Sequence, residues 1–134
     1  MMAALNVDEI KIKCSDGVDR TIPDLINFIE SFNNNELYSY NNISYQVTAI
    51  RDSHFCGYVF ITDDLPYEGH GGITYKDNVK QGFDCCHNGD IFCLAVQHLF
   101  YKNEKNATFK MPDFIHQECK KIIDEYLNFK NMKI

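Results

Sequence analysis

The chain has 134 residues, of which 45% are hydrophobic and 13% aromatic, and its net charge is −6. This length provides for a single domain spanning residues 1–134, and the composition is that of a globular protein rather than a disordered one. The 19 acidic residues outnumber the 13 basic ones, and no basic run interrupts them. Nucleic acid polymers are therefore not expected as partners, because a phosphate backbone requires a basic surface.

The N-terminal residues and the cysteines indicate the cellular compartment in which the protein is expected. The N-terminal apolar run is too short and too soon charged for a signal peptide, and no apolar stretch is long enough to span a membrane. We therefore expect a cytoplasmic protein without a membrane partner. The six cysteines are then expected to be reduced thiols, and the lack of a Cys-x-x-Cys motif disfavours a closed structural zinc site.

The first part of the chain predicts a strand, a turn and a helix. Residues 9–13 alternate as a short strand, and a turn follows at residues 15–17. Thr21 then caps a helix that ends by the Asn cluster at residues 33–35. Its apolar residues recur at helical spacing: Ile22, Leu25, Ile26 and Ile29.

The middle of the chain predicts two pairs of strands. Residues 43–50 and 55–61 are rich in β-branched and aromatic side chains and are expected to pair as antiparallel strands. Residues 73–75 and 82–86 form a second pair of short strands, joined by the polar residues 76–81.

The last part of the chain contains the clearest pattern. Residues 91–100 fit a helix or a buried strand, and the two alternatives stay open. Pro112 and Asp113 suit the first turn of a C-terminal helix. One apolar stripe runs along this helix: Ile115, Cys119, Ile122, Ile123, Tyr126 and Leu127. The expected fold is α+β, an antiparallel sheet with helices packed on one face, including the amphipathic C-terminal helix.

Residues 69–90 form the most informative segment. Five of the seven glycines lie in it, together with two histidines and two adjacent cysteines. Glycine lets the backbone take positive φ and approach a ligand closely, at an entropic cost. Its concentration beside groups that bind ligands or move protons indicates a pocket.

Three motifs carry a family resemblance: Gly57-Tyr58-Val59, His70-Gly71-Gly72-Ile73-Thr74-Tyr75, and Gly82-Phe83-Asp84-Cys85-Cys86-His87-Asn88-Gly89-Asp90. They resemble a family of small, functionally uncharacterised bacteriophage-type proteins. The chain departs from the family pattern at Cys86 and Asn88, where Ala is usual, and in the short acidic loop at Asp63-Asp64. The resemblance implies a phage or viral origin and no particular reaction.

Three residues are candidates for acid–base chemistry. His70 lies between glycines, where the backbone can turn sharply and present the imidazole. Asp84 precedes His87 by three residues, and in a turn the carboxylate would orient the ring, as in catalytic pairs. The alternatives are a loop histidine bonded to a local carbonyl and an aspartate that accepts loop N–H groups. We expect His70, Asp84 and His87 to converge on one cleft.

Backbone and aromatic groups of the same segment are candidates for ligand binding. An anion would be bound by backbone N–H groups at Gly71, Gly72, Asn88 and Gly89. At least one of Gly71 and Gly72 is therefore expected to hold positive φ.

Side chains complete the predicted pocket. Tyr75 and Phe83 are candidates to stack on a base. Thr74 either contacts a phosphate oxygen or fills a strand position, and Asp90 either contacts the ligand or caps a helix. Cys85 and Cys86 are expected to be structural rather than nucleophilic.

No cofactor is predicted. His70, His87, Asp84 and Asp90 supply ligand types that suit Zn²⁺ or Mn²⁺. No recognised metal-binding spacing supports such a site, so a metal is the minor alternative.

Two function classes follow. The first is a ligand-binding protein that captures a nucleotide-like or other polar metabolite, with evasion of host defence as the role that a phage origin implies. The alternative is a small hydrolase or phosphodiesterase using the Asp84–His87 pair with His70. The missing nucleophile favours binding. A homodimer stays open as the assembly.

Overall fold

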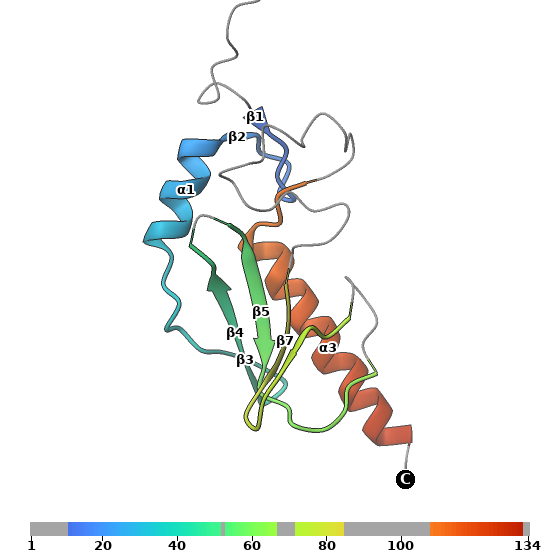
Figure 1. Ribbon diagram of the computed structural model, residues 1–134. Helices are drawn as coiled ribbons and strands as arrows, with labels where there is room; N and C mark the ends of the chain where they lie inside the picture. Colours follow the sequence, from blue (N-terminus) through green and yellow to red (C-terminus); the bar gives the residue numbers. More distant parts are fainter. Residues whose placement is uncertain (1–10, 52, 67–71, 85–107, 133–134) are drawn as a thin grey trace, which may run out of the picture.

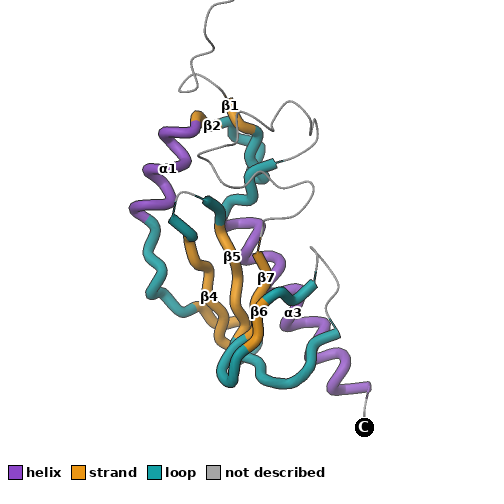
Figure 2. Tube along the Cα trace, viewed as in Figure 1, coloured by secondary structure: helices purple, strands orange, loops and turns teal. Residues whose placement is uncertain are grey.

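The structure is a computed structural model that describes residues 11–51, 53–66, 72–84 and 108–132 (Figure 1). Its elements are β1 (Lys11–Ile12), β2 (Arg20–Thr21), α1 (Ile22–Ser31), β3 (Tyr38–Tyr40), β4 (Ile43–Ala49), β5 (Phe55–Val59), β6 (Tyr75–Lys76), β7 (Gln81–Asp84) and α3 (Pro112–Met132). Five strands form one antiparallel sheet in the order β3-β4-β5-β7-β6, and β1 pairs with β2 apart from it. The predicted α+β class is confirmed (Figure 2).

Helix α3 packs lengthwise against the sheet, chiefly on β5 (Figure 1). Gly57 permits this close approach, because a Cβ there would lie 2.8 Å from both Cys119 Sγ and Ile115 Cγ2. The predicted apolar stripe is buried except for Leu127, which is partly buried. Helix α3 is the longest described helix, and no described helix is long and apolar enough to cross a membrane.

Helix α1 begins as predicted. The Thr21 side chain accepts a hydrogen bond from the backbone N–H of Asp24 at 3.3 Å, which satisfies one of the free donors of the first turn. Phe28 and the C-cap residue Phe32 contact Phe55 of β5 edge to face, with ring centroids 5.9 and 5.0 Å apart. Since Phe55 and Gly57 lie on the same face of β5, both helices contact one face of the sheet, as expected.

The segment before α1 forms hydrogen bonds with the residues that precede α3. Phe109 forms backbone hydrogen bonds with Lys13 (2.8 Å) and Ser15 (2.9 Å). The Ser15 hydroxyl also accepts from the backbone N–H of Met111 at 2.9 Å. Residues nearly one hundred positions apart in the chain therefore fix each other at this end of the molecule.

Besides the short β2, which was not predicted, two strand predictions needed correction. Residues 38–40 were not predicted as a strand, yet β3 pairs with β4 through a two-residue turn. Both turn residues, Asn41 and Asn42, have positive φ (50° and 67°), as a type I′ hairpin requires. The second correction is a small shift: β6 begins at Tyr75 rather than at residue 73, and β7 begins at Gln81. Residues 91–100 lie outside the described part of the chain.

Candidate functional site

The β6–β7 hairpin brings together the two glycine motifs that the sequence singled out. Tyr75 pairs with Gly82, and the backbone N–H of Thr74 donates to the Gly82 carbonyl at 2.9 Å. This antiparallel pairing puts Gly72 and Asp84 at the same end of the hairpin. Gly72 has φ +78°, which confirms the expected positive φ at one of the two adjacent glycines.

The turn of the hairpin fixes Tyr75. Asp77 accepts hydrogen bonds from the backbone N–H groups of Val79 (2.7 Å) and Lys80 (2.8 Å), and the Tyr75 hydroxyl donates to it at 2.7 Å. These donors, with the Lys80 N–H foremost, lower the pKa of the Asp77 carboxyl. Tyr75 therefore presents its ring, which is 47% exposed, in a defined position.

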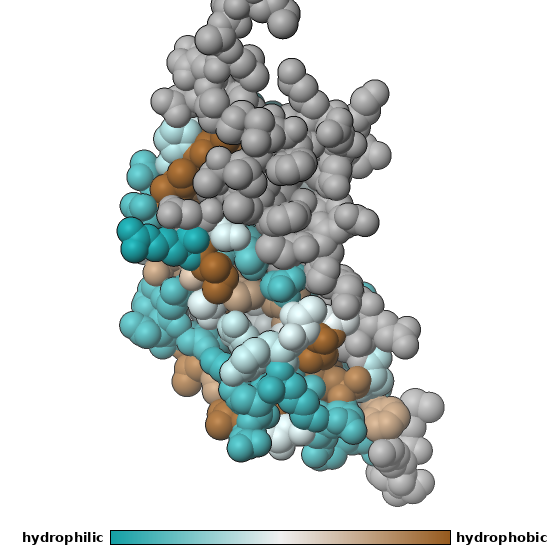
Figure 3. Space-filling view, viewed as in Figure 1, coloured by the Kyte–Doolittle hydropathy of each residue, from teal (hydrophilic) through white to brown (hydrophobic). Residues whose placement is uncertain are grey.

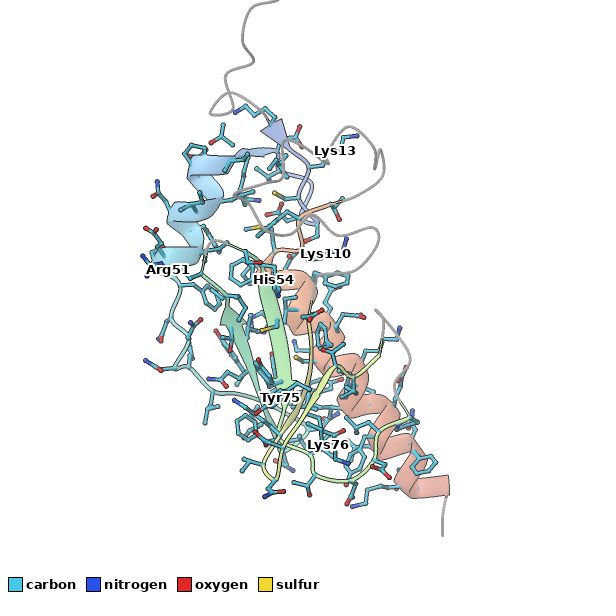
Figure 4. All side chains as sticks on the ribbon, in the orientation of Figure 1. Lys13, Arg51, His54, Tyr75, Lys76 and Lys110 are labelled. Carbon is cyan, nitrogen blue, oxygen red and sulfur yellow. The ribbon has the colours of Figure 1, made fainter. Side chains whose placement is uncertain are left out.

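A hollow of about 310 Å³ lies beside this hairpin. Since Gly57 faces α3, its strand neighbours Cys56 and Tyr58 face the opposite side of the sheet, where the hollow lies. The residues that line it are Ile50, His54, Cys56, Tyr58, Thr74, Tyr75, Phe83 and Asp84. Figure 4 shows two of them, His54 near the upper end of β5 and Tyr75 farther along the sheet.

Tyr58 lines the hollow and covers part of β7. Its ring lies directly over Gly82, where a Cβ would clash with the ring and lie 2.6 Å from the Gly57 carbonyl oxygen. It also meets the Tyr75 ring edge to face, with centroids 5.6 Å apart. Burial, with a smaller contribution from the hydrogen bond to Cys56 at 3.5 Å, raises the pKa of the Tyr58 hydroxyl. The Tyr58 hydroxyl and the Cys56 thiol are therefore both neutral at neutral pH.

The hollow has one acidic side chain among its described residues. This residue is Asp84, and no Lys or Arg is among the described residues that line the hollow. Lys76 forms an ion pair with Asp64 at 2.7 Å, and Lys80 lies over the Tyr58 ring, 4.4 Å from its centroid. Arg51 lines a separate hollow together with Glu30. Arg51, Lys76 and Lys80 therefore do not line this hollow.

Four residues around the hollow were not predicted as site residues from the sequence: Ile50, His54, Cys56 and Tyr58. His54 lies 2.6 Å from the Ser53 hydroxyl through Nδ1, and Cys56 and Tyr58 follow it at alternate positions. The signal was available in the alternation of β5, where Cys56 and Tyr58 share a face opposite to Gly57. Burial raises the pKa of the Cys56 thiol, so its thiolate is not the species present at neutral pH.

Apart from Gly72, whose positive φ is given above, the sequence-predicted residues divide into two groups. Thr74, Tyr75 and Asp84 come together at the hollow, and Phe83 contributes to its wall although its side chain is only 1% exposed. Phe83 thus offers almost no ring surface for stacking. The others lie outside the described residues: His70, Gly71, Cys85, Cys86, His87, Asn88, Gly89 and Asp90. The convergence of His70, Asp84 and His87 stays a prediction.

No metal centre is formed by residues 11–51, 53–66, 72–84 and 108–132, where no three His, Cys, Asp or Glu side chains are grouped to hold an ion. The described cysteines, Cys14, Cys56 and Cys119, are free and buried. Comparison with protein-family models, curated proteins and solved structures gave no match to this chain. The site is therefore interpreted from its own geometry and chemistry.

Proposed function

We propose that this protein captures a small, nucleotide-like polar ligand on the sheet face opposite α3. The observation that carries the proposal is the common hollow beside Thr74, Tyr75 and Asp84, residues that come from the two glycine motifs. Its volume, about 310 Å³, is at the lower end of the range for small-molecule sites. Aromatic walls with a few polar groups are the usual composition of such sites.

The glycine backbone supports an anion site beside the hollow. Positive φ at Gly72 lets successive backbone N–H groups point toward one oxygen, as in anion-binding nests. We assign the anionic end of the ligand to this backbone and propose that His70, Gly71, Asn88 and Gly89 contribute to its binding. Asp90 either joins them or caps the segment that follows.

The resemblance to phage-type proteins extends the proposal to a biological role. Capture of a host signalling nucleotide would lower its free concentration and so help a virus to evade host defence. This role requires binding and no turnover, in agreement with the lack of a nucleophile signature in the sequence.

Capture is tested with the full chain. Mass spectrometry of the purified protein under native conditions reports a co-purified ligand, and calorimetric titration with mononucleotides and cyclic nucleotides measures affinity. We expect binding that weakens in Asp84→Asn by about 1–3 kcal/mol, the usual cost of a lost charge-assisted hydrogen bond. Asp64→Asn is the matched control, since the Asp64 side chain is 99% exposed and lies outside the hollow. Absence of binding to every probe would refute the proposal.

The same titration tests the alternative, a hydrolase or phosphodiesterase in which Asp84 orients His87 as the base and His70 holds the substrate. Chromatography of each mixture, with and without Zn²⁺ or Mn²⁺, reports any product. Turnover that disappears in Asp84→Asn while affinity is retained would favour the enzyme, because only the transition state needs the oriented base.

A further inference from the structure

A second hollow lies at the C-terminal end of α1, apart from the one beside the β6–β7 hairpin. Its volume is about 400 Å³, within the range of about 300–1,000 Å³ that small-molecule sites occupy. Both segments that build it, residues 29–34 and 49–51, belong to the continuously described range 11–51. The residues that line it are Ile29, Glu30, Phe32, Asn34, Ala49 and Arg51, and none of them lines the first hollow.

Hydrogen bonds hold the walls of this second hollow in place. The Asn34 side chain pairs with the backbone of Ala49, since its Oδ1 accepts from the N–H at 2.7 Å and its Nδ2 donates to the carbonyl at 3.2 Å. The Asn34 carbonyl also accepts from Gln46 Nε2 at 2.6 Å. The turn after β4 is closed by the backbone N–H of Ile50, which donates to the His54 carbonyl at 2.8 Å. A ligand therefore meets a preformed surface, which reduces the entropy lost on binding.

The second hollow has an apolar floor and one charged side chain of each sign. Ile29 and Ala49 are 4% and 8% exposed and belong to the core, and Phe32 packs against it. Glu30 and Arg51 are exposed, and neither forms an ion pair or a side-chain hydrogen bond with another described residue. A ligand with a single charge would be attracted by one of these two side chains and repelled by the other. A ligand that carries both charges can pair with each.

The end of α1 gives the two charges a direction. The C-terminal turn of a helix is electronegative, because its last carbonyl groups have no partners within the helix. The last turn of α1 has no basic residue of its own. A cationic group is therefore favoured beside Glu30 at the end of the helix. An anionic group is favoured at Arg51, which follows β4 and lies near the same end of α1 (Figure 4), because a guanidinium binds a carboxylate through two parallel N–H donors.

We propose that this second hollow binds a free α-amino acid with an apolar side chain. The α-carboxylate pairs with Arg51, the α-ammonium pairs with Glu30, and the side chain packs on Phe32 and on the core residues beneath it. A nucleotide suits this hollow less well, because its phosphate would meet a carboxylate as well as a cation. The site is independent of nucleotide capture, since the two hollows share no lining residue.

Titration of the isotope-labelled full chain with L-leucine, followed by nuclear magnetic resonance, tests the site. Two analogues test its parts: leucinamide lacks the carboxylate, and isocaproate lacks the ammonium. The wild-type protein is expected to bind leucine with a dissociation constant of about 1 mM or lower, and each analogue about tenfold or more weakly, because a charge-assisted hydrogen bond is lost.

The variants match the analogues. Arg51→Gln should weaken leucine binding by about tenfold or more and leave leucinamide binding unchanged, since leucinamide has no carboxylate to lose. Glu30→Gln should likewise weaken leucine binding and leave isocaproate binding unchanged. Lys121→Gln is the control, because this exposed residue of α3 lies outside the hollow and its change should leave the affinity for leucine as it is.

Three results would each overturn the proposal. The first is that the amide signals of residues 29–34 and 49–51 do not shift at millimolar leucine. The second is equal affinity for leucine and both analogues, and the third is unchanged leucine affinity in Arg51→Gln and Glu30→Gln. Thermal melting checks that both variants are folded, and if either is not, the comparison of leucine with its analogues on the wild-type protein decides. Glycine tests the apolar floor: it should bind about tenfold more weakly than leucine, and equal affinity would contradict packing of the ligand side chain there.

Discussion

Gly57 and Gly82 lie on neighbouring strands, and each leaves room for a group that a methyl would displace. Gly57 admits α3, with Cys119 Sγ and Ile115 Cγ2 each 2.8 Å from the position of an added Cβ. Gly82 lies on the opposite side of the sheet, beneath the Tyr58 ring. Gly57 therefore leaves room for α3 in the core, and Gly82 leaves room for the Tyr58 ring beside the hollow.

Gly57→Ala is expected to destabilise the fold by about 1–3 kcal/mol, because an added methyl overpacks the contact between β5 and α3. Urea denaturation measures the change. The cost should be smaller in a Cys119→Ala background, where one of the opposing atoms is removed. An equal cost in the two backgrounds would contradict direct contact between these residues.

His116 is the described residue for which a pH effect on stability is clearest. Its Nδ1 lies 2.8 Å from the Tyr45 hydroxyl, and the Tyr38 ring stands edge-on to it at 4.5 Å. Burial is the main cause that lowers the pKa of His116, and Lys120 adds to it, while Asp113 and Glu36 act in the opposite direction. The imidazole is therefore neutral in the folded protein at neutral pH.

Stability should consequently fall as the pH falls. Above the pKa of an unfolded histidine, about 6.5, the ring is neutral in both states and no effect arises. Below it the unfolded chain takes up a proton that the folded protein resists, so the free energy of unfolding decreases. The slope due to this residue cannot exceed about 1.4 kcal/mol per pH unit, because a single histidine takes up at most one proton. Urea denaturation at pH 7.5 and 5.5 should show a smaller difference for His116→Gln than for the wild-type protein.

At the scale of elements, the two hairpins of the sheet differ in how they turn. The β6–β7 turn depends on the Asp77 side chain, whereas the β3–β4 turn depends on backbone conformation, with Asn41 and Asn42 both at positive φ. Asparagine tolerates this conformation better than most residues, and glycine tolerates it best.

Asn42→Gly should therefore stabilise the protein by a few tenths of a kcal/mol to about 1 kcal/mol, because Asn-Gly is the favoured pair in a type I′ turn. Asn42→Ala should destabilise it by about 1–2 kcal/mol, the cost of a Cβ in the left-handed region. Thermal and urea unfolding of both variants measure the effect. A change of the same sign in the two variants would exclude the turn as its cause.

At the scale of the whole molecule, the described core is one layer between the sheet and the two helices. Gln81, only 2% exposed, is the one polar residue in the buried set, and its amide donates to the Ile61 carbonyl at 2.9 Å and to that of Asp63 at 2.5 Å. Exposed apolar residues are scattered: in Figure 3 the described surface in view is largely teal, with brown side chains in separate patches. Side chains inside this layer are therefore shielded from solvent together, as long as the protein is folded.

Peptide-resolved alkylation tests this common protection. Cys14 and Cys119 belong to this core and are 5% and 0% exposed, and burial raises the pKa of each thiol. We expect iodoacetamide to label both only after denaturant unfolds the protein, since the reactive thiolate requires solvent. Rapid labelling of Cys119 in native buffer would contradict its position between α3 and β5.

Much of the fold could be predicted because it depends on local patterns. The 3.6-residue period of α3, the Thr21 cap and the alternation of β4 and β5 each report which side of an element is buried, and this information lies in neighbouring residues. The β3–β4 hairpin was missed although its Asn-Asn pair was a turn signal, because β3 is only three residues long. Short strands are stabilised by pairing rather than by their own pattern.

The sequence by itself determined the α+β class, the main elements and the glycine motifs that lead to the candidate site. Tertiary structure alone decided that Thr74, Tyr75 and Asp84 share a hollow with His54 and Tyr58, and that Phe83 is withdrawn into the core. The physical reason is strand order: β7 lies between β5 and β6, so residues from three strands meet on one face. Pairing between distant strands follows from the packing of the whole sheet, which no local pattern records.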